Sequence, residues 1–501
     1  YAKAVEQQQD AETYYRYAQM LKAEGKYAES NAQMKKFASL APNDQRAVEF
    51  KQDPNYLPKL KSQTKLFDEK ALDINSDKSD FGAVLTNDNY LYFASARNKA
   101  RKNYGWNEEP FLDLYKAVYN ADGTFSEPVP VTEVNTKFHD GPATVSADGN
   151  TMYFASESFN EGDFEKDKAK KLKYGQVYLY KATKDGDKWT NIKALPFTSK
   201  AYSTSSPSLS RDGKTLYFSS NMPGSLGGND VWKVAVNADG TYGTPENLGK
   251  SVNTEGNESF PFITDDNKLY FSSDGRKGFG ALDVYVIDLN RGTEAVNVGA
   301  PVNTEKDDFA FSFNTAKNIG FFSSNRRGDD NIYLATPVCG VEVATLVKDA
   351  RTGKTLAEAK VSILDAKKNV IETKTTLANG EAFYSVDCNK AYVIQVTRDG
   401  YESNTFPVAK TNGGTVKIAA DLQPIDVIVK ETEVALNEIY FEFDKSNITK
   451  DGAFELDKLV QAMKANPSLE IMVKAHTDSR GSDQYNLNLS DRRARATVQY
   501  V

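Results

Sequence analysis

An acid and an arginine near the end of the chain have residue types and a spacing that could serve ligand binding. Asp478 and Arg493 both lie in the stretch AHTDSRGSDQYNLNLSDRRA, with a loop pattern before a helical one. A carboxylate and a guanidinium can grip a charged ligand, and the protein would then be an anchor. The alternative is solvated surface charge, because 26% of all residues are charged. The choice between the two depends on the elements that position this pair.

Composition restricts the classes of function. A chain of 501 residues is longer than one core usually organises, so we expect a multidomain protein. Its net charge of −7 argues against a nucleic-acid partner, which needs clustered Lys and Arg. Two histidines, His139 and His476, and two cysteines, Cys339 and Cys388, are too few for the usual zinc sites and make a Cys nucleophile with a His base improbable, so we expect no metal or cofactor.

No stretch reaches the roughly 18 apolar residues that cross a bilayer. A removed signal sequence or a lipid anchor stays open, because the chain starts within a helical pattern.

Residues 1–45 have the pattern of two antiparallel helices. Tyr14, Ala18 and Leu21 share one helical face, Gly25 marks a turn, and Phe37 lies on the second helix. The spacing resembles one tetratricopeptide repeat, although that family usually has Trp where Tyr14 stands. One repeat buries too little surface to stand alone, so the plainer interpretation is a helical hairpin that packs on the next domain.

Residues 46–337 repeat a turn, an aromatic strand and a second strand about every fifty to sixty residues. The copies are VLTNDNYLYFAS, TVSADGNTMYFAS, SLSRDGKTLYFSS, FITDDNKLYFSS and SFNTAKNIGFFSS. An Asn followed by Thr or Ser accompanies all copies except the third. Radial repetition of short strands predicts a β-propeller, because blades bury their apolar faces only against one another. We expect five blades, with a sixth if residues 45–66 supply strands. The repeats resemble WD40-like, TolB-like propellers of bacterial envelope proteins, which implies a binding scaffold more often than an enzyme.

Two loops of this region are longer than their counterparts in the other copies. They carry aromatic and basic residues, namely Arg97, Arg101, Tyr104 and Trp106 in the first loop and Phe159, Phe164 and Tyr174 in the second. Trp, Tyr and Arg anchor many protein interfaces, so one hypothesis is a docking surface for a partner. Tolerated surface insertions are the alternative.

Residues 338–425 alternate short strands with Gly or Asn turns, which predicts a small β-sandwich. The run from Val341 to Tyr401 resembles the carboxypeptidase regulatory-like domain, a non-catalytic companion of a peptidase. Cys339 and Cys388 could close a disulfide worth about 3 to 4 kcal/mol in an oxidising compartment. Two buried free thiols are the alternative.

Residues 434–501 alternate strand, helix, strand and helix patterns, as an α/β domain would, with strands expected at IYFEFDKSNI and LEIMVKA. The segments IYFEFDKSNI and AHTDSRGSDQYNLNLSDRRA resemble the OmpA-like peptidoglycan-binding domain. The family's closing strand and later helix have no counterpart in this sequence, so the domain is C-terminally incomplete relative to that pattern. We expect Gly481 to permit a tight turn and Ser482 or Asp483 to cap the helix.

The resemblance assigns roles to the opening pair of residues. Diaminopimelate of a peptidoglycan stem peptide presents an ammonium beside a carboxylate. By the resemblance, Asp478 takes the ammonium and Arg493 the carboxylate, with Asn486 and Thr477 in the same pocket. Arg492 lies about 100° round the helix and is expected to face solvent.

The order of the four domains resembles the PorE-type envelope proteins of Bacteroidota, which are associated with type 9 secretion and gliding motility. That resemblance implies a periplasmic protein, held at the outer membrane by a lipid anchor or a partner, that links a secretion or gliding assembly to peptidoglycan. A PorP/SprF-like barrel is the candidate outer-membrane partner. No bond is made or broken, so the protein is not expected to be an enzyme. The alternatives are a propeller-based hydrolase, which needs carboxylates or a Ser-His pair around the propeller axis, and a ligand sensor of the envelope.

Overall fold

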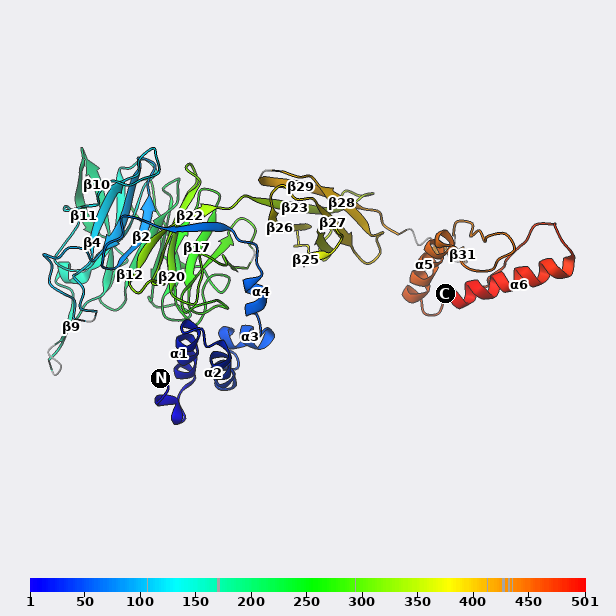
Figure 1. The fold of residues 1–501 in the computed structure, drawn as a ribbon, viewed down its shortest axis with the longest axis horizontal. Coiled ribbons are helices and arrows are strands. Elements are labelled where there is room, and N and C mark those ends of the chain that lie inside the picture. Colours follow the sequence, from blue (N-terminus) through cyan, green and yellow to red (C-terminus); the bar gives the residue numbers. More distant parts are fainter. Residues whose placement is uncertain are drawn as a thin grey trace. The chain divides into compact units, whose positions relative to one another are not determined.

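A computed structural model describes residues 1–105, 107–168, 172–292, 294–411, 413–425, 429–430, 433–434 and 436–501. The fold is mainly β with few helices, as the sequence predicts (Figure 1). The chain forms two compact units, Tyr1–Cys339 and Gly340–Val501. In the part described, no helix has the length and apolar character needed to cross a membrane.

The first unit begins with the predicted helical hairpin. A short helix η1 (Ala4–Glu6) precedes α1 (Ala11–Ala23) and α2 (Tyr27–Leu40), which pack against each other around Tyr15 and Phe37. Two further helices follow, α3 (Gln45–Gln52) and α4 (Leu57–Lys61). Residues 45–61 are therefore mostly helical, and the possible sixth blade that they could have supplied is absent from the part of the chain described.

The helices are attached to the next domain by side chains that reach backbone carbonyls. Gln19 donates to the carbonyl of Asp274 at 2.6 Å, and Tyr15 donates to the same oxygen. Tyr56 donates to Gly278 at 2.8 Å and Tyr27 to Phe279 at 3.0 Å. The hairpin thus packs on the neighbouring domain, which is the plainer of the two interpretations above.

Five antiparallel sheets of four strands follow and form the propeller (Figure 1). Blade 1 contains β2 (Asp80–Leu85), β3 (Tyr90–Ser95), β4 (Asp113–Val118) and β5 (Val129–Pro130). Blade 2 contains β6 (Asp140–Val145), β7 (Thr151–Glu157), β10 (Val177–Asp185) and β11 (Lys188–Ala194). Blade 3 contains β12 (Thr204–Leu209), β13 (Thr215–Ser220), β14 (Asp230–Ala235) and β15 (Glu246–Asn247). Blade 4 contains β16 (Glu258–Ile263), β17 (Lys268–Ser273), β18 (Asp283–Asp288) and β19 (Val296–Asn297).

Blade 5 closes the ring with a strand from the beginning of the domain. It contains β20 (Asp308–Asn314), β21 (Ile319–Ser324) and β22 (Asn331–Pro337), and β1 (Phe67–Ala71) pairs with β22 as the fourth strand. The first strands of the five blades, β2, β6, β12, β16 and β20, contact one another in a closed circle. Closure through β1 leaves no long open edge between the first and last blades.

Apolar residues of neighbouring blades interlock to form the propeller core. The repeated aromatic of the sequence pattern is almost fully buried in every blade, at Phe93, Phe154, Phe218, Phe271 and Phe322. Five apolar clusters each join two adjacent blades; one of them combines Tyr92 of blade 1 with Phe154 of blade 2. This arrangement explains why the sequence pattern recurs once per blade.

The repeated Asn fastens four of the five blades to the preceding blade of the ring. Asn253 accepts from the backbone N–H of Val231 at 2.8 Å and donates to its carbonyl at 2.9 Å. Asn75, Asn135 and Asn303 make the same two bonds to the third strand of the preceding blade. At the third blade, which lacks the Asn, the hydroxyl of Thr204 accepts from Leu179 instead.

The second unit begins with the predicted β-sandwich. One sheet pairs β26 (Glu381–Asp387), β23 (Gly340–Asp349) and β29 (Gly414–Leu422). The other pairs β25 (Val370–Thr375), β24 (Lys360–Leu364), β27 (Tyr392–Thr397) and β28 (Asn404–Val408). The apolar residues of the two inner faces form one core. Both Cys339, directly before β23, and Cys388, directly after β26, are disulfide-bonded.

The end of the chain contains a short pair of strands, β30 (Val429–Lys430) and β31 (Glu433–Val434), and two helices, α5 (Lys450–Ala465) and α6 (Asp483–Tyr500). Both helices were expected from the sequence. The strands expected at IYFEFDKSNI and LEIMVKA are not formed in the described residues. A strand exists only through hydrogen bonds to a neighbour, and these two segments do not pair in the structure, so their alternating pattern alone does not make a sheet.

Candidate functional site

Helix α6 carries Arg493 and begins as the sequence predicts. Ser482 is the N-cap, and its side chain accepts from the backbone N–H of Tyr485 at 3.3 Å. Gly481 precedes it at φ +103°, a conformation that favours glycine, so the loop can turn sharply into the helix.

Backbone carbonyls of the preceding segment hold the guanidinium of Arg493. Its Nε donates to the carbonyl of Lys445 at 3.0 Å, and its Nη2 donates to the carbonyl of Glu442 at 3.3 Å. The group also lies over the ring of Phe441, 5.0 Å from the centroid. Arg493 has five N–H donors, so these contacts orient the guanidinium and leave donors for a ligand.

Asp478 is oriented by α6 as well. Asn486 donates through Nδ2 to the backbone carbonyl of Asp478 at 3.2 Å, and the N–H of Arg480 donates to its carboxylate at 3.2 Å. Asn486 therefore supports the loop that carries Asp478. Thr477 is half-buried next to Asp478.

Asp478 and Arg493 are each held by hydrogen bonds near α6, but they do not bond to each other. Among the residues described here, no ion pair within 4.0 Å joins them. A carboxylate that is oriented but not paired can receive an ammonium, and a guanidinium in the same state can receive a carboxylate. Arg492 is exposed, whereas Arg493 is half-buried, which separates the roles of the two adjacent arginines.

The structure also shows a contact that the sequence did not indicate. The hydroxyl of Tyr485 donates to the carboxylate of Asp444 and so ties the start of α6 to the segment that holds Arg493. Residues from separate parts of the domain meet here, and a local pattern cannot reveal such a contact.

In the propeller, the two arginines of the first long loop form ion pairs with buried carboxylates. Arg97 pairs with the buried carboxylate of Asp80 at 2.7 Å and Arg101 with that of Asp113 at 2.6 Å. A guanidinium committed to a buried carboxylate is not free for a partner, because removing it would leave a buried charge unpaired. Trp106 lies outside the described residues.

The remaining aromatic residues of the two long loops do meet. Ring contacts run from Tyr104 to His139 at 4.7 Å, from His139 to Phe111 at 4.7 Å, and onward through Phe138 to Phe159 at 4.9 Å and Phe164 at 5.5 Å. This aromatic row joins the loops of blades 1 and 2. The sequence did not single out Phe111, which lies at the end of the first long loop before β4, or Phe138 and His139, which directly precede β6 and lie outside both loops. Among the expected docking residues that the structure describes, Tyr104 and Tyr174 are the most exposed, at 40% and 47%.

Buried acids at the start of the inner strands have structural partners. Asp80, Asp140, Glu258 and Asp308 each accept from a Ser or Thr four residues earlier. Arg326 pairs with Asp308 at 2.5 Å, as Arg97 pairs with Asp80. In blade 2, Asp140 accepts from Ser156 at 2.5 Å and has no arginine partner among the described residues, and burial raises its pKa to about 7.

The propeller axis is apolar where the inner strands converge. The rings of Phe81, Phe260 and Phe309 contact one another with centroids 5.1 to 6.3 Å apart. Beside them is a cavity of about 30 Å³ lined by all five inner strands. Ligand pockets are typically several hundred Å³ in volume, so this cavity does not fit a wall fragment or peptide substrate.

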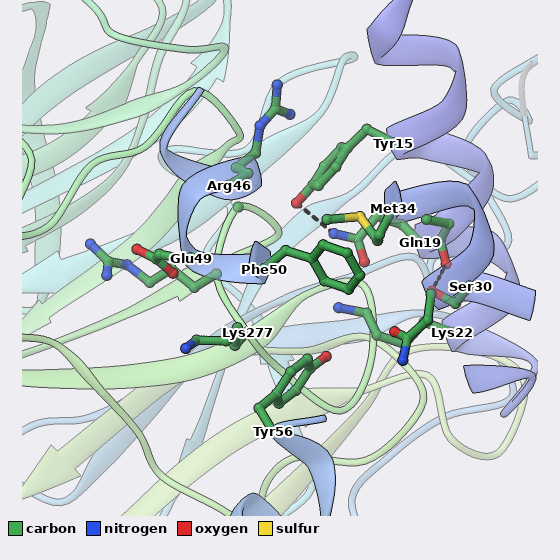
Figure 2. Close-up of a pocket in the computed structure, with 14 residues that line it drawn as sticks. Tyr15, Gln19, Lys22, Ser30, Met34, Arg46, Glu49, Phe50, Tyr56 and Lys277 are labelled. Atoms are coloured by element: carbon green, nitrogen blue, oxygen red, sulfur yellow. Dashed lines mark hydrogen bonds between the residues drawn. The ribbon is translucent and has the colours of Figure 1, made fainter. Parts of the chain in front are cut away.

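A second small cavity, of about 40 Å³, lies between the N-terminal helices and the β17–β18 loop (Figure 2). Lys22 is buried at its wall, and Gln19 Oε1 and Arg46 Nη1 have no hydrogen-bond partner within the described chain. A polar cavity of this size suits one or a few ordered waters. We assign it to the packing of the helices on the ring.

Comparison with known proteins identifies the C-terminal segment. Residues 440–501 match the model of the OmpA family. The peptidoglycan-associated lipoprotein of Pasteurella multocida (strain Pm70) is 36% identical over 73 residues, which cover 15% of this chain and 49% of that protein. Outer membrane porin F of Pseudomonas aeruginosa is 35% identical over 79 residues, covering 16% of this chain and 22% of that protein. The chain thus spans about half or less of the length of these curated relatives.

A putative TolB from Agrobacterium tumefaciens is similar to the chain in structure. The TM-score is 0.32 at 12% identity, with 71% of this chain and 94% of that one covered. These values are too low to relate the two proteins, and the assignment of the propeller rests on its own sheet topology.

Proposed function

We propose that this protein is a non-enzymatic periplasmic tether that binds peptidoglycan through its OmpA-like domain. The observation that carries the proposal is the oriented but unpaired arrangement of Asp478 and Arg493 within the segment that matches the OmpA family. In this proposal Asp478 accepts the ammonium of a stem-peptide diaminopimelate, and Arg493 donates to its carboxylate. Asn486 keeps Asp478 in position, and Thr477 lines the same pocket.

The propeller supplies the second end of the tether. We assign partner binding to the aromatic row of Tyr104, Phe159 and Phe164, with Tyr174 beside it, because aromatic residues on adjacent loops are typical interface anchors and the two tyrosines are exposed. Arg97 and Arg101 stabilise the first of these loops through their ion pairs with Asp80 and Asp113. The partner is an outer-membrane component of a secretion or gliding assembly, such as a PorP/SprF-like barrel, in line with the PorE-type order of domains. A lipid anchor or this partner holds the protein at the outer membrane.

Co-sedimentation with purified peptidoglycan tests the wall-binding half. Wild type is expected to pellet with a diaminopimelate-containing wall and to pellet much less with a wall whose stem peptide has lysine at that position, because lysine lacks the second carboxylate. Asp478→Asn and Arg493→Ala are expected to stay in solution. Arg492→Ala, which removes the same charge one residue away, is expected to pellet like wild type. Equal pelleting of all variants, each shown by circular dichroism to be folded, would reject the site.

A further inference from the structure

A hairpin with many lysines projects from the second long loop of the propeller (Figure 1). It consists of β8 (Glu165–Asp167) and β9 (Leu172–Tyr174), which pair only with each other. Its described residues, 165–168 and 172–174, include three lysines, two acids and no arginine, whereas the whole chain has a net charge of −7. The hairpin is therefore a basic projection on an acidic protein.

Two of its lysines are held close together without a counterion. Lys166 and Lys173 lie directly opposite each other in the hairpin register. Both ammonium groups lie over the ring of Phe164, at 5.4 and 4.6 Å from its centroid. Within the described chain neither ammonium has an ion pair with a carboxylate. Like charges directly opposite each other destabilise a strand pair, so an anion bound between them would relieve repulsion.

The composition of the hairpin distinguishes an anionic lipid surface from an acidic protein. Protein interfaces are enriched in Arg and depleted in Lys, because a guanidinium pairs with a carboxylate in a bidentate manner. Lysine clusters are typical of segments that bind anionic headgroups, where delocalised attraction is sufficient. Leu172 and Tyr174 are 48% and 47% exposed on the other face of the hairpin, where they pair with Asp167 and Glu165. Apolar and tyrosine side chains suit the boundary between headgroups and acyl chains.

We propose that the β8–β9 hairpin binds the phosphate groups of an anionic phospholipid surface, with Lys166 and Lys173 as the central contacts. The relevance of this contact rests on the proposed location at the outer membrane, but the contact itself is independent of wall binding. It would orient the propeller against the membrane while the aromatic row at the base of the hairpin remains available to a protein partner.

Vesicle flotation with the full chain tests the proposal. Wild type is expected to float with vesicles of phosphatidylcholine and phosphatidylglycerol in equal parts and not with phosphatidylcholine alone. Removing two lysine contacts is expected to lower partitioning at least about 25-fold, at roughly fivefold per lysine, in Lys166→Glu/Lys173→Glu. Lys188→Glu/Lys193→Glu, on the exposed outer strand β11 of the same blade, makes the same charge change and should alter partitioning by no more than about twofold.

Three outcomes would overturn the inference: unchanged flotation of Lys166→Glu/Lys173→Glu, equal flotation of wild type with neutral vesicles, or tighter binding of soluble polyglutamate than of anionic vesicles. The last result would indicate an acidic protein segment. Asp478→Asn serves to separate the two proposals, because it should lose wall binding and keep vesicle binding. If wild type binds the wall but does not float with anionic vesicles, only the proposed lipid contact is rejected, and the proposed wall binding stands.

Discussion

Arg493 donates to the backbone carbonyl of Lys445 at 3.0 Å, which fixes a guanidinium of α6 against a segment almost fifty residues earlier in the chain. The contact uses one edge of the planar guanidinium, whose other N–H donors remain for a ligand. A substitution that keeps the positive charge but changes this geometry therefore tests the site more specifically than one that removes the charge.

Arg493→Lys is expected to weaken peptidoglycan binding although it preserves the charge. One ammonium cannot hold two backbone carbonyls and also make a bidentate contact to a ligand carboxylate. Loss of a charged hydrogen bond of this kind costs about 1.5 to 3 kcal/mol, or roughly 10- to 100-fold in affinity. Binding isotherms with soluble muropeptides would measure the change. Wild-type affinity in Arg493→Lys would mean that charge alone is sufficient at this position.

Asn253→Ala is expected to destabilise the propeller by about 1 to 3 kcal/mol, because it leaves the buried N–H of Val231 without its partner and removes one of the two donors to the Val231 carbonyl, which still accepts from Leu248. Asn253 is fully buried, whereas Asn75 makes the equivalent bonds at a half-buried position. Asn75→Ala should therefore cost less, since water can reach the groups it exposes. Urea unfolding monitored by fluorescence would compare the two. A larger loss in Asn75→Ala would show that the bonds matter chiefly at the ring closure.

Asp140 makes the stability of the fold depend on pH. Burial raises the pKa of Asp140 to about 7, and burial together with the charge of Asp140 raises that of Glu157 to about 7. Burial lowers the pKa of His139 to about 4, so this imidazole is neutral near pH 7 and does not offset either acid. A carboxyl whose pKa is raised on folding adds stability that is complete below its unfolded pKa, near 4, and is lost as pH rises through about 7.

Asp140→Asn should therefore gain roughly 2 to 3 kcal/mol relative to wild type between pH 5 and pH 8, because the wild type loses about 1.4 kcal/mol per pH unit up to about pH 7. The amide keeps an acceptor for the N–H of Thr136, which donates to Asp140 in the wild type. Melting temperatures across this pH range would show wild type losing stability as the pH rises and Asp140→Asn losing less. Parallel curves for the two proteins would contradict the assignment.

The inner strands all bulge at the same point, and the residue there has positive φ. Gly82 and Gly141 occupy it in blades 1 and 2, whereas Ser206, Phe260 and Ala310 occupy it in the other three. Gly82→Ala is expected to cost at least about 2 kcal/mol, because the left-handed backbone disfavours a side chain and the new methyl would lie 2.8 Å from Cβ of Pro142.

Ala310→Gly offers the reverse change at the same place. Glycine relieves the backbone strain at this position, which should offset most of the lost methyl contact and the greater entropy of the unfolded chain. We therefore expect Ala310→Gly to lower the free energy of unfolding by less than about 0.5 kcal/mol. Ala94→Gly, in the regular strand β3, is the matched control and should cost about 1 to 2 kcal/mol. Thermal unfolding would rank the three variants. Equal losses at Ala310 and Ala94 would show that the bulge is not strained.

Several features followed from the sequence alone because they depend on local periodicity or on a compact motif. The recurrence of Phe93 and its four counterparts predicted five blades, since each copy needs the same apolar neighbour. The helices around Tyr14 and Phe37, the alternating strands of the sandwich, and the loop and helix that carry Asp478 and Arg493 were recognisable for the same reason. Gly481 and Ser482 also marked the turn and cap before α6 from their residue types.

Tertiary structure decided the features that require residues distant in sequence. Arg97 was a docking candidate because of its residue type. In the folded ring the carboxylate of Asp80 is buried beside it, and Arg97 pairs with that charge instead of facing a partner. The row from Tyr104 to Phe164 arises from segments of two blades, and β1 reaches β22 only because the ring closes. The segments IYFEFDKSNI and LEIMVKA have strand patterns but form no strand in the structure, because no neighbouring strand of the described chain pairs with them. A side-chain pattern is encoded locally, whereas an ion pair, a sheet or a ring exists only when the fold supplies the second partner.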